Sequence, residues 1–321
     1  MAGNATRVVG LGNALVDVVA SVDTAAIARH GLTPGGMHLV DRAAAEALYG
    51  EVGPGLVQSG GSVANSIAHL RGSGLPCSFI GKIAEDELGH AFRADLAALG
   101  VDFPPLGPAD GVGTGRCVVL VTPDGERTMS TYLGAAQGLR PADVEAAMPA
   151  RAALLLVEGY LWDSPEGEAV IRTASARARD AGARIALTPS DAGCVARHHG
   201  AMLAFIRDHC DILVGNHHEV GALAGTDSPE AALAWARRHA AICAVTMSEQ
   251  GALVANTAQA WRIEALPVER VVDTTGAGDA FAAGFLAGVL AGEALPEAGR
   301  RGAGLAARVV THPGARARSA A

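Results

Sequence analysis

The chain has 321 residues, which is enough for one large domain or two small ones. Half of its residues are hydrophobic and 18% are charged, a balance that excludes a disordered chain. The formal net charge of −8 at pH 7 argues against a general binder of nucleic acids or of anionic membranes. We therefore expect one globular domain over residues 1–321, with no nucleic-acid partner.

Lysine and cysteine usage excludes further classes. The only lysine, Lys82, is followed by Ile83 and not by the Ser or Thr that a P-loop requires. The His-Arg-Asp and Asp-Phe-Gly motifs of protein kinases do not occur. Five dispersed cysteines favour free thiols over a disulfide framework. Because no apolar segment suits a signal peptide or a membrane span, we expect a cytoplasmic protein without a membrane partner.

The first part of the chain mixes apolar runs with helical spacings. These predict a strand at 7–12, a helix at 62–71, a strand at 78–80 and a helix across 88–99. Between Arg116 and Leu133, two β-rich runs flank the turn signal Pro123-Asp124-Gly125. We predict a hairpin there, polar enough on one face to cover a binding site.

From about residue 150 onward, strands and helices alternate. The predicted strands are 154–157, 185–187, 212–214, 242–247, 251–255 and 260–263, and the predicted helices are 165–181, 195–208, 217–224, 229–239, 277–291 and 296–310. This alternation predicts an α/β fold with a parallel sheet and helices on both faces. Ligands of such folds bind beyond the carboxyl ends of the strands, so we expect the chemistry directly after them.

The segment Asp273–Asp279 reads Asp-Thr-Thr-Gly-Ala-Gly-Asp and leads into a predicted helix. Gly276 and Gly278 allow a ligand to approach the backbone, and a helix N-terminus favours an anion. A carboxylate at Asp279 would repel a phosphate unless it takes a proton, so the pattern predicts a base beside an anion site. The alternative is that Asp279 only caps the helix.

Asp17 lies inside an apolar run near the N-terminus, where an unpaired carboxylate is costly. Its two oxygens suit two vicinal hydroxyl groups of a sugar, and Asn13 and Asn65 add donors and acceptors. Gly60 and Gly61 would let the sugar lie against the backbone. The alternatives are that Asp17 lies on the surface of a twisted strand and that Asn65 belongs to an ordinary helix start.

The segment from Asp273 to Asp279, followed by Ala-Phe-Ala-Ala-Gly-Phe, resembles the C-terminal signature of the PfkB/ribokinase family of small-molecule kinases. Matching pieces occur in order over nearly the whole chain, at 60–65, 81–89, 216–219 and 246–251. The resemblance implies a ribokinase-like, doubly wound, mostly parallel sheet with helices on both faces and a small β lid. The lid would be built from about 14–45 and 112–135, inserted in the α/β core.

The resemblance also implies an ATP-dependent reaction. Asp279 would activate the acceptor hydroxyl group, and the amides of Gly276, Ala277 and Gly278 would form an anion hole. Asp17, Gly61 and Asn65 would be ligands of the acceptor sugar. The nucleotide site would comprise Asn216, Thr246, Ser248, Gly251, Gly278 and His312.

Metal ions and assembly follow from the same resemblance. Glu219 would hold Mg²⁺ through water, since Mg²⁺ keeps several waters in proteins. In some relatives the C-terminal tail and the carbonyl groups of Asp273–Thr275 hold a monovalent cation, which implies a K⁺ site at Asp273 and Thr275. Some relatives dimerise by pairing their lids, so a homodimer through the lid is an open expectation.

The Gly-Gly-Ser-x-x-Asn motif and the Gly-Asn-x-x-x-Asp start resemble adenosine kinase-type members, the bacterial ones above all, more than ribokinase. A nucleoside needs an apolar or aromatic slot for its base, for which we select Tyr132 and Phe103. We predict the conversion of a nucleoside, adenosine, to its 5′-monophosphate. The alternatives are a free-sugar kinase of the ribokinase or fructokinase type and a binding protein that has lost catalysis.

Other residues allow more than one interpretation. Arg127 either reaches a phosphate or is a solvated hairpin residue. The pairs His198-His199 and His217-His218 are predicted to face solvent, because no third zinc ligand lies at a recognised spacing. The segment Gly10-Leu11-Gly12 lacks the third glycine of a dinucleotide fingerprint, which argues against a nicotinamide dehydrogenase.

Overall fold

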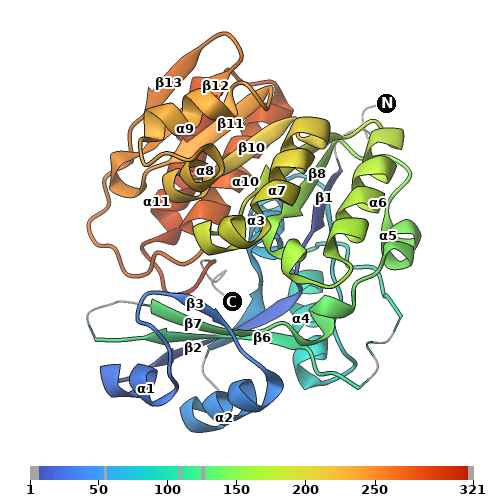
Figure 1. Ribbon diagram of the computed structural model, residues 1–321, viewed down its shortest axis with the longest axis vertical. Helices are drawn as coiled ribbons and strands as arrows, with labels where there is room; N and C mark the ends of the chain where they lie inside the picture. Colours follow the sequence, from blue (N-terminus) through green and yellow to red (C-terminus); the bar gives the residue numbers. More distant parts are fainter. Residues whose placement is uncertain (1–6, 54–55, 108, 110, 124–126, 317–321) are drawn as a thin grey trace.

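The computed structural model describes residues 7–53, 56–107, 109, 111–123 and 127–316, and Figure 1 shows a large α/β unit beside a smaller sheet. The described strands of the larger sheet are, from edge to edge, β13 (Ala260–Ile263), β12 (Ala252–Asn256), β11 (Ile242–Thr246), β10 (Ile212–Asn216), β9 (Arg184–Thr188), β8 (Leu154–Glu158), β1 (Val8–Leu11) and β5 (Cys77–Ile80). Neighbouring strands from β11 to β5 are parallel, and β12 and β13 are antiparallel. The predicted α/β fold with a mostly parallel sheet is confirmed.

The larger sheet is buried on both faces because successive side chains of a strand point to opposite sides. In β8, Leu155 and Val157 pack into one hydrophobic cluster, and Leu154 and Leu156 pack into the other. The first cluster includes residues of α5 (Pro141–Ala147), α6 (Gly167–Asp180), α7 (Ala192–His209), α8 (His217–Ala224) and α9 (Pro229–Ala236). The second includes residues of α3 (Ser62–Gly72), α4 (Glu87–Ala98), α10 (Ala277–Ala291) and α11 (Leu295–Val309).

The second sheet lies below the larger unit in Figure 1, with two helices on its far side. Its described strands are, in order, β3 (Met37–Leu39), β7 (Arg127–Tyr132), β6 (Gly115–Val121), β2 (Leu15–Ser21) and β4 (Leu56–Gly60). Ile27 of α1 (Thr24–Arg29) and Leu48 of α2 (Arg42–Val52) pack on Val118 and Leu120 of β6. The other face of the small sheet is not covered by these two helices and faces the larger unit.

The predicted hairpin corresponds to β6 and β7, which pair in antiparallel register, while 124–126 of its turn lie outside the described residues. The segments 14–45 and 112–135 expected to form the lid contain four strands of the small sheet but not β4. The chain passes from β4 through Gly61 directly into α3 of the larger unit, so β4 joins the two units. In the part of the chain that is described, no helix has the length and apolarity to span a membrane.

The order of the strands in the larger sheet indicates where a ligand would bind. Starting from β1, the chain first adds β5 on one side of that strand and later adds β8 and the following strands on the other side. The direction in which strands are added to the sheet therefore reverses between β1 and β8. Ligands of doubly wound sheets bind outside the carboxyl ends of the strands at such a reversal. Here the residues beyond these ends include Asn13 after β1 and Glu158 at the end of β8.

Candidate active site

A cavity of about 620 Å³ lies between the two sheets. Its walls come from the carboxyl ends of the large sheet, from the starts of α3 and α10, and from the inner face of the small sheet. Eleven of the predicted site residues line it: Asn13, Asp17, Gly61, Asn65, Asn216, Glu219, Thr246, Thr275, Gly276, Gly278 and Asp279. Residues from five distant segments thus meet in one cavity, whose size suits a small-molecule ligand.

Asp279 stands in the first turn of α10, where it faces the start of α3. Its Oδ1 atom accepts a hydrogen bond of 2.6 Å from the Ser62 hydroxyl, and its Oδ2 atom accepts one of 3.3 Å from the Asn65 amide. Burial raises the pKa of Asp279 to about 6, although both hydrogen bonds act in the opposite direction. A carboxyl group with this pKa is mostly ionised at pH 7 and is able to take a proton.

The loop before α10 forms the expected turn. Gly276 has φ of 72°, and a Cβ atom there would lie 2.7 Å from Ala315, so any other residue would be strained at this position. A Cβ atom on Gly278 would meet nothing within 4 Å, so space for a ligand adjoins that residue. The N–H of Ala277 already donates to the Thr274 carbonyl at 3.2 Å. Of the three predicted anion-hole amides, those of Gly276 and Gly278 have no acceptor among the described residues.

Asp17 lies in the middle of β2 on the inner face of the small sheet, 7% exposed. A Cβ atom on Gly60 would overlap the Asp17 carboxyl group, which explains glycine at that position although Gly60 itself does not line the cavity. Gly61 has φ of 96° and packs against the Asn13 carbonyl. Burial raises the pKa of Asp17 to about 7, and Arg316 opposes that rise.

Glu158 is a site residue that sequence reasoning missed. It ends β8, is buried, and lines the cavity. It accepts hydrogen bonds from the N–H and side-chain amide of Asn13, at 3.3 and 3.2 Å, and from the N–H of Val63 at 3.0 Å. Burial raises its pKa to about 7. The available signal was an acidic residue closing the run Leu154–Val157 at the carboxyl end of a buried strand.

Asn216 and Glu219 form a reciprocal cap at the start of α8. The Asn216 amide donates to Glu219 Oε1 at 2.6 Å, and the Asn216 N–H donates to Oε2 at 3.1 Å. Burial raises the pKa of Glu219 to about 8, with Asp191 and Asp279 adding to the rise. The cap holds the carboxyl group of Glu219 at the wall of the cavity.

The walls of this cavity carry more acidic than basic groups. Four carboxyl groups with raised pKa values line it, those of Asp17, Glu158, Glu219 and Asp279. Arg127 is the single arginine or lysine among the described lining residues. Hard divalent cations prefer oxygen ligands, so the donor set suits Mg²⁺. That Glu219 holds Mg²⁺ through water stays a prediction.

Arg127 is not a solvated hairpin residue, and because it lines the cavity its contact with a phosphate stays a prediction. Its side chain is 12% exposed and pairs with Asp273 Oδ1 and the Thr275 hydroxyl, so β7 is tied to the loop before α10. The other oxygen of Asp273 accepts a hydrogen bond of 2.6 Å from the Gly314 N–H. Both oxygens of Asp273 are thus engaged, one of them by a guanidinium group. This arrangement does not fit a K⁺ site at the Asp273 carboxylate.

Several predicted residues lie away from the cavity. Phe103 packs on Phe79 and Phe92, and the Tyr132 ring lies 5.9 Å from the guanidinium carbon of Arg116. Neither of the two aromatic residues selected for a base slot lines the cavity; the apolar lining of the small sheet comes instead from Leu15, Met37, Leu39, Val119, Met129 and Leu133.

The remaining nucleotide-loop predictions are also outside the cavity walls. Ser248 begins the short turn η3 (Ser248–Gln250) and Gly251 follows it, with φ of 52° and 85°. A Cβ atom on Gly251 would overlap the Ile263 carbonyl, so this glycine is required by packing. His312 is exposed and interacts with Thr311 and the Arg308 carbonyl. Of the six residues predicted for the nucleotide site, Asn216, Thr246 and Gly278 line the cavity.

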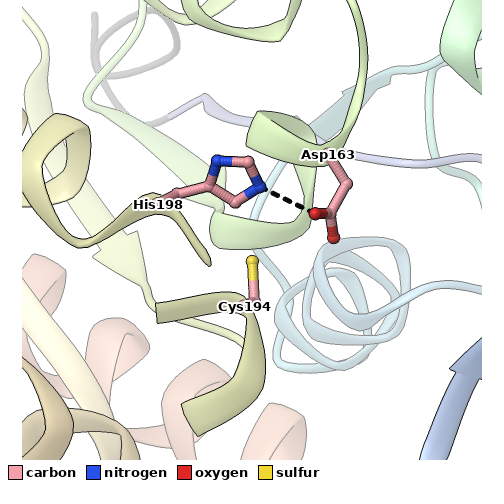
Figure 2. Close-up of side chains that lie close together, drawn as sticks. All are labelled: Asp163, Cys194 and His198. Carbon is pink, nitrogen blue, oxygen red and sulfur yellow. Dashed lines mark hydrogen bonds and ion pairs between the residues drawn. The ribbon is translucent and has the colours of Figure 1, made fainter. Parts of the chain in front are cut away.

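The prediction of a solvent-facing side chain is confirmed for His218 and needs correction for His198 and His199. His198 is not solvent-facing, because its ring lies 2.7 Å from Asp163 Oδ1, and His199 contacts the Leu223 carbonyl at 3.2 Å. Figure 2 shows Asp163, Cys194 and His198 together, the one such cluster of possible metal ligands among the described residues. Arg197 also binds both oxygens of Asp163, at 2.9 and 2.7 Å. Both oxygens of Asp163 are thus engaged, and the Cys194 thiol donates to the Gly159 carbonyl at 3.4 Å, so these contacts connect α7 to the turn that contains Asp163.

A model of the pfkB family of carbohydrate kinases matches residues 40–320. The chain belongs to this family. It resembles the structure of an adenosine kinase from Sinorhizobium meliloti, with a TM-score of 0.91 and 40% identity over 97% of this chain and 96% of that one. It also resembles a probable sugar kinase from Rhizobium etli CFN 42, with a TM-score of 0.93 and 37% identity over 99% of this chain and 96% of that one. The fold is thus that of ribokinase-like pfkB kinases.

Among curated sequences, the chain is 31% identical over 245 residues to the guanosine-inosine kinase of Escherichia coli K12. That match covers 70% of this chain and 54% of the relative, so the chain spans about half the length of that pfkB-type kinase. The relatives thus include kinases named for nucleosides and a kinase named for a sugar.

Proposed function

We propose that the protein is an ATP-dependent kinase that phosphorylates the 5′-hydroxyl group of a nucleoside, adenosine, to form AMP and ADP. One observation carries this proposal: Asp17 and Asp279 line the same cavity, one on the small sheet and one at a helix N-terminus. Asp17 suits the two vicinal hydroxyl groups of a ribose. Asp279 suits the hydroxymethyl group that reacts.

In the proposed reaction, the 5′-oxygen of the acceptor attacks the γ-phosphorus of ATP. The new bond joins that oxygen to phosphorus, and the bond from the γ-phosphorus to the β,γ-bridging oxygen breaks to release ADP. Asp279 takes the proton of the hydroxyl group. The free N–H groups of Gly276 and Gly278 stabilise the charge that develops on the phosphoryl oxygens. Mg²⁺, when bound near Glu219, neutralises phosphate charge.

The small sheet has features that suit a lid over the cavity. Its inner face carries apolar side chains such as Met37, Val119 and Met129 into the cavity, where they suit a flat base better than a free sugar. Arg127 connects this sheet to the loop before α10. Closure over the ligands would exclude water, which limits wasteful hydrolysis of ATP.

The alternative is a free-sugar kinase, which the similarity to the probable sugar kinase supports. The test is ATP consumption with Mg²⁺ against adenosine, inosine, guanosine, ribose, fructose and 2-keto-3-deoxygluconate. Turnover on adenosine supports the proposal. Turnover on a free sugar alone contradicts adenosine as the acceptor but remains consistent with the proposed role of Asp279. ATP binding without turnover on any acceptor favours the non-catalytic binder.

A further inference from the structure

The side chains on the inner face of the small sheet lie in rows that cross its strands. The pairing registers place Cys117 of β6 beside Asp17 of β2 and opposite Thr131 of β7. On its other side, Thr131 pairs with Leu39 of β3. All four residues line the cavity, so one row of side chains crosses this wall from Asp17 to Leu39.

The cavity-lining side chains on either side of this row are apolar. They are Met37, Val119 and Met129 on one side, and Leu15 and Leu133 on the other. Among the described strand residues that line the cavity from the small sheet, those with side-chain oxygen or nitrogen atoms are Asp17, Arg127 and Thr131. Arg127 pairs with Asp273 in the loop before α10. The row therefore offers a ligand two oxygen-bearing groups within an apolar wall, the Asp17 carboxylate and the Thr131 hydroxyl.

The Thr131 hydroxyl group has one weak partner. Thr131 is 6% exposed, and its hydroxyl donates to the Cys117 sulfur atom at 3.4 Å. Sulfur is a weak acceptor, and no oxygen or nitrogen atom of the described residues bonds to this hydroxyl. A hydroxyl group also carries two acceptor lone pairs. A ligand with a polar edge would therefore give this buried group a stronger hydrogen bond than the protein does.

The spacing of the row selects the length of the ligand. Neighbouring strands lie about 4.8 Å apart, so the two strand steps from Asp17 to Thr131 span about 10 Å. A pentose held at Asp17 by its vicinal hydroxyl groups is too short to reach Thr131. A nucleoside held in the same way carries its base further along the row, against the apolar side chains. The edge of a purine base presents both donors and acceptors, either of which suits a hydroxyl group.

We infer that Thr131 is a specificity-determining residue of the acceptor site, whose hydroxyl group bonds to the base of a nucleoside while Asp17 holds the sugar. This role rests on the proposed function, in which the acceptor is a nucleoside. A free sugar makes the contact with Asp17 alone, so Thr131 favours nucleosides over free sugars. Because a hydroxyl group both donates and accepts, Thr131 does not by itself separate an amino purine from an oxo purine.

The test compares Thr131→Val and Thr131→Ser with wild type, as full chains with ATP and Mg²⁺. Thr131→Val keeps the shape of the side chain and removes the hydroxyl group, so the KM for adenosine should rise about three- to tenfold. Thr131→Ser keeps the hydroxyl group and should stay within about twofold of wild type. The kcat and the KM for ATP should change little, since the lost bond is made equally before and during phosphoryl transfer.

Base analogues distinguish a direct contact from a packing effect. The analogues 1-deazaadenosine, 3-deazaadenosine, 7-deazaadenosine and purine riboside each lack one polar group of adenosine. With the analogue that lacks the partner of Thr131, wild type and Thr131→Val should have the same KM, while the others should show the full loss. Ser130→Ala is the matched control, because Ser130 is the next residue of β7, is also buried and does not line the cavity. Its KM for adenosine should equal that of wild type.

The outcomes separate this role from the proposed function. If wild type phosphorylates free sugars and no nucleoside, the proposed function fails, and the role of Thr131 fails with it. If wild type phosphorylates adenosine but Thr131→Val matches it, or loses the same factor with every analogue, only the role of Thr131 is overturned. A rise in the KM for ATP alone also overturns it, because Thr131 would then face the nucleotide. If Thr131→Val does not fold, Thr131→Ala and Thr131→Ser form the pair that differs by the hydroxyl group.

Discussion

The Ser62 hydroxyl group donates a 2.6 Å hydrogen bond to Asp279 across 217 residues of sequence. It links the first residue of α3 to the first turn of α10, and the Asn65 amide binds the second oxygen of the same carboxylate. Asp279 is therefore held by α3 before any acceptor is present. An incoming hydroxyl group would meet a carboxylate whose orientation is already fixed.

Asp279→Asn should lower kcat by about a hundredfold to ten-thousandfold, the usual contribution of a general base. An asparagine still accepts from Ser62 through its carbonyl oxygen, so the fold and ligand binding should be largely kept. Turnover assays and calorimetric binding of adenosine and ATP check both halves of this prediction. Survival of near-normal turnover would show that another group takes the proton.

Gly60→Ala should damage the acceptor site selectively. The added Cβ atom would overlap the Asp17 carboxyl group and push it off position, so the acceptor KM should rise at least tenfold with a smaller effect on the KM for ATP. Gly50→Ala is the matched control, because a Cβ atom there meets nothing within 4 Å inside α2. That substitution should stabilise the helix by about 0.5 to 1 kcal/mol and leave kinetics unchanged. Equal acceptor KM values in the two variants would contradict this account of Asp17.

The parts of the site that were predictable are those carried by local sequence. Asp279 and Gly276 lie in one short motif, and Asp17 stands out as a charge in an apolar run. Glu158 carries only a weak local signal, an acidic residue at the end of a buried strand, because its partner Asn13 lies 145 residues away. Long-range pairing of this kind depends on the whole strand order, which a single sequence does not specify.

The choice of Tyr132 for the base slot shows a second limit. Side chains of a strand alternate between faces, and Met129 and Thr131 of β7 line the cavity. Tyr132 has the opposite parity and turns to Arg116 instead. The composition of this segment predicted the strand and the hairpin. It did not predict which face of the strand each side chain occupies, and a difference of one position in the sequence changes that face.

Wild-type turnover should not depend on K⁺. The Asp273 carboxylate already bonds to Arg127, to the Thr275 N–H at 2.6 Å and to the Gly314 N–H, so a second cation there would meet a guanidinium charge. Replacing K⁺ by N-methylglucamine at constant ionic strength should change kcat less than twofold. Arg127→Met should lower kcat and make K⁺ stimulatory. Strong stimulation of wild type would mean that Arg127 leaves Asp273 during turnover.

The ligand-free protein should lose stability as the pH rises from about 5 to 8. The carboxyl groups of Asp17, Glu158, Glu219 and Asp279 have folded-state pKa values of about 7, 7, 8 and 6, above their ordinary values. In this pH range the folded state binds more protons than the unfolded state, so the free energy of unfolding falls with pH.

Urea unfolding at pH 5.5 and 8.5 measures this slope, and Asp279→Asn serves as the matched variant. Because the variant has no charge to bury at position 279, its free energy of unfolding at pH 8.5 should exceed that of wild type by about 1 to 3 kcal/mol. At pH 5.5 the difference should be smaller, since Asp279 is then largely protonated in the folded state. Carboxyl groups whose pKa is lowered on folding, such as Asp163, titrate below this window. Burial lowers the pKa of His69 from 6.5, which adds an opposite slope that is common to wild type and variant and so cancels in their difference. A stability that is constant or rises with pH would contradict the description of the cavity as a set of buried carboxyl groups whose desolvation outweighs their hydrogen bonds.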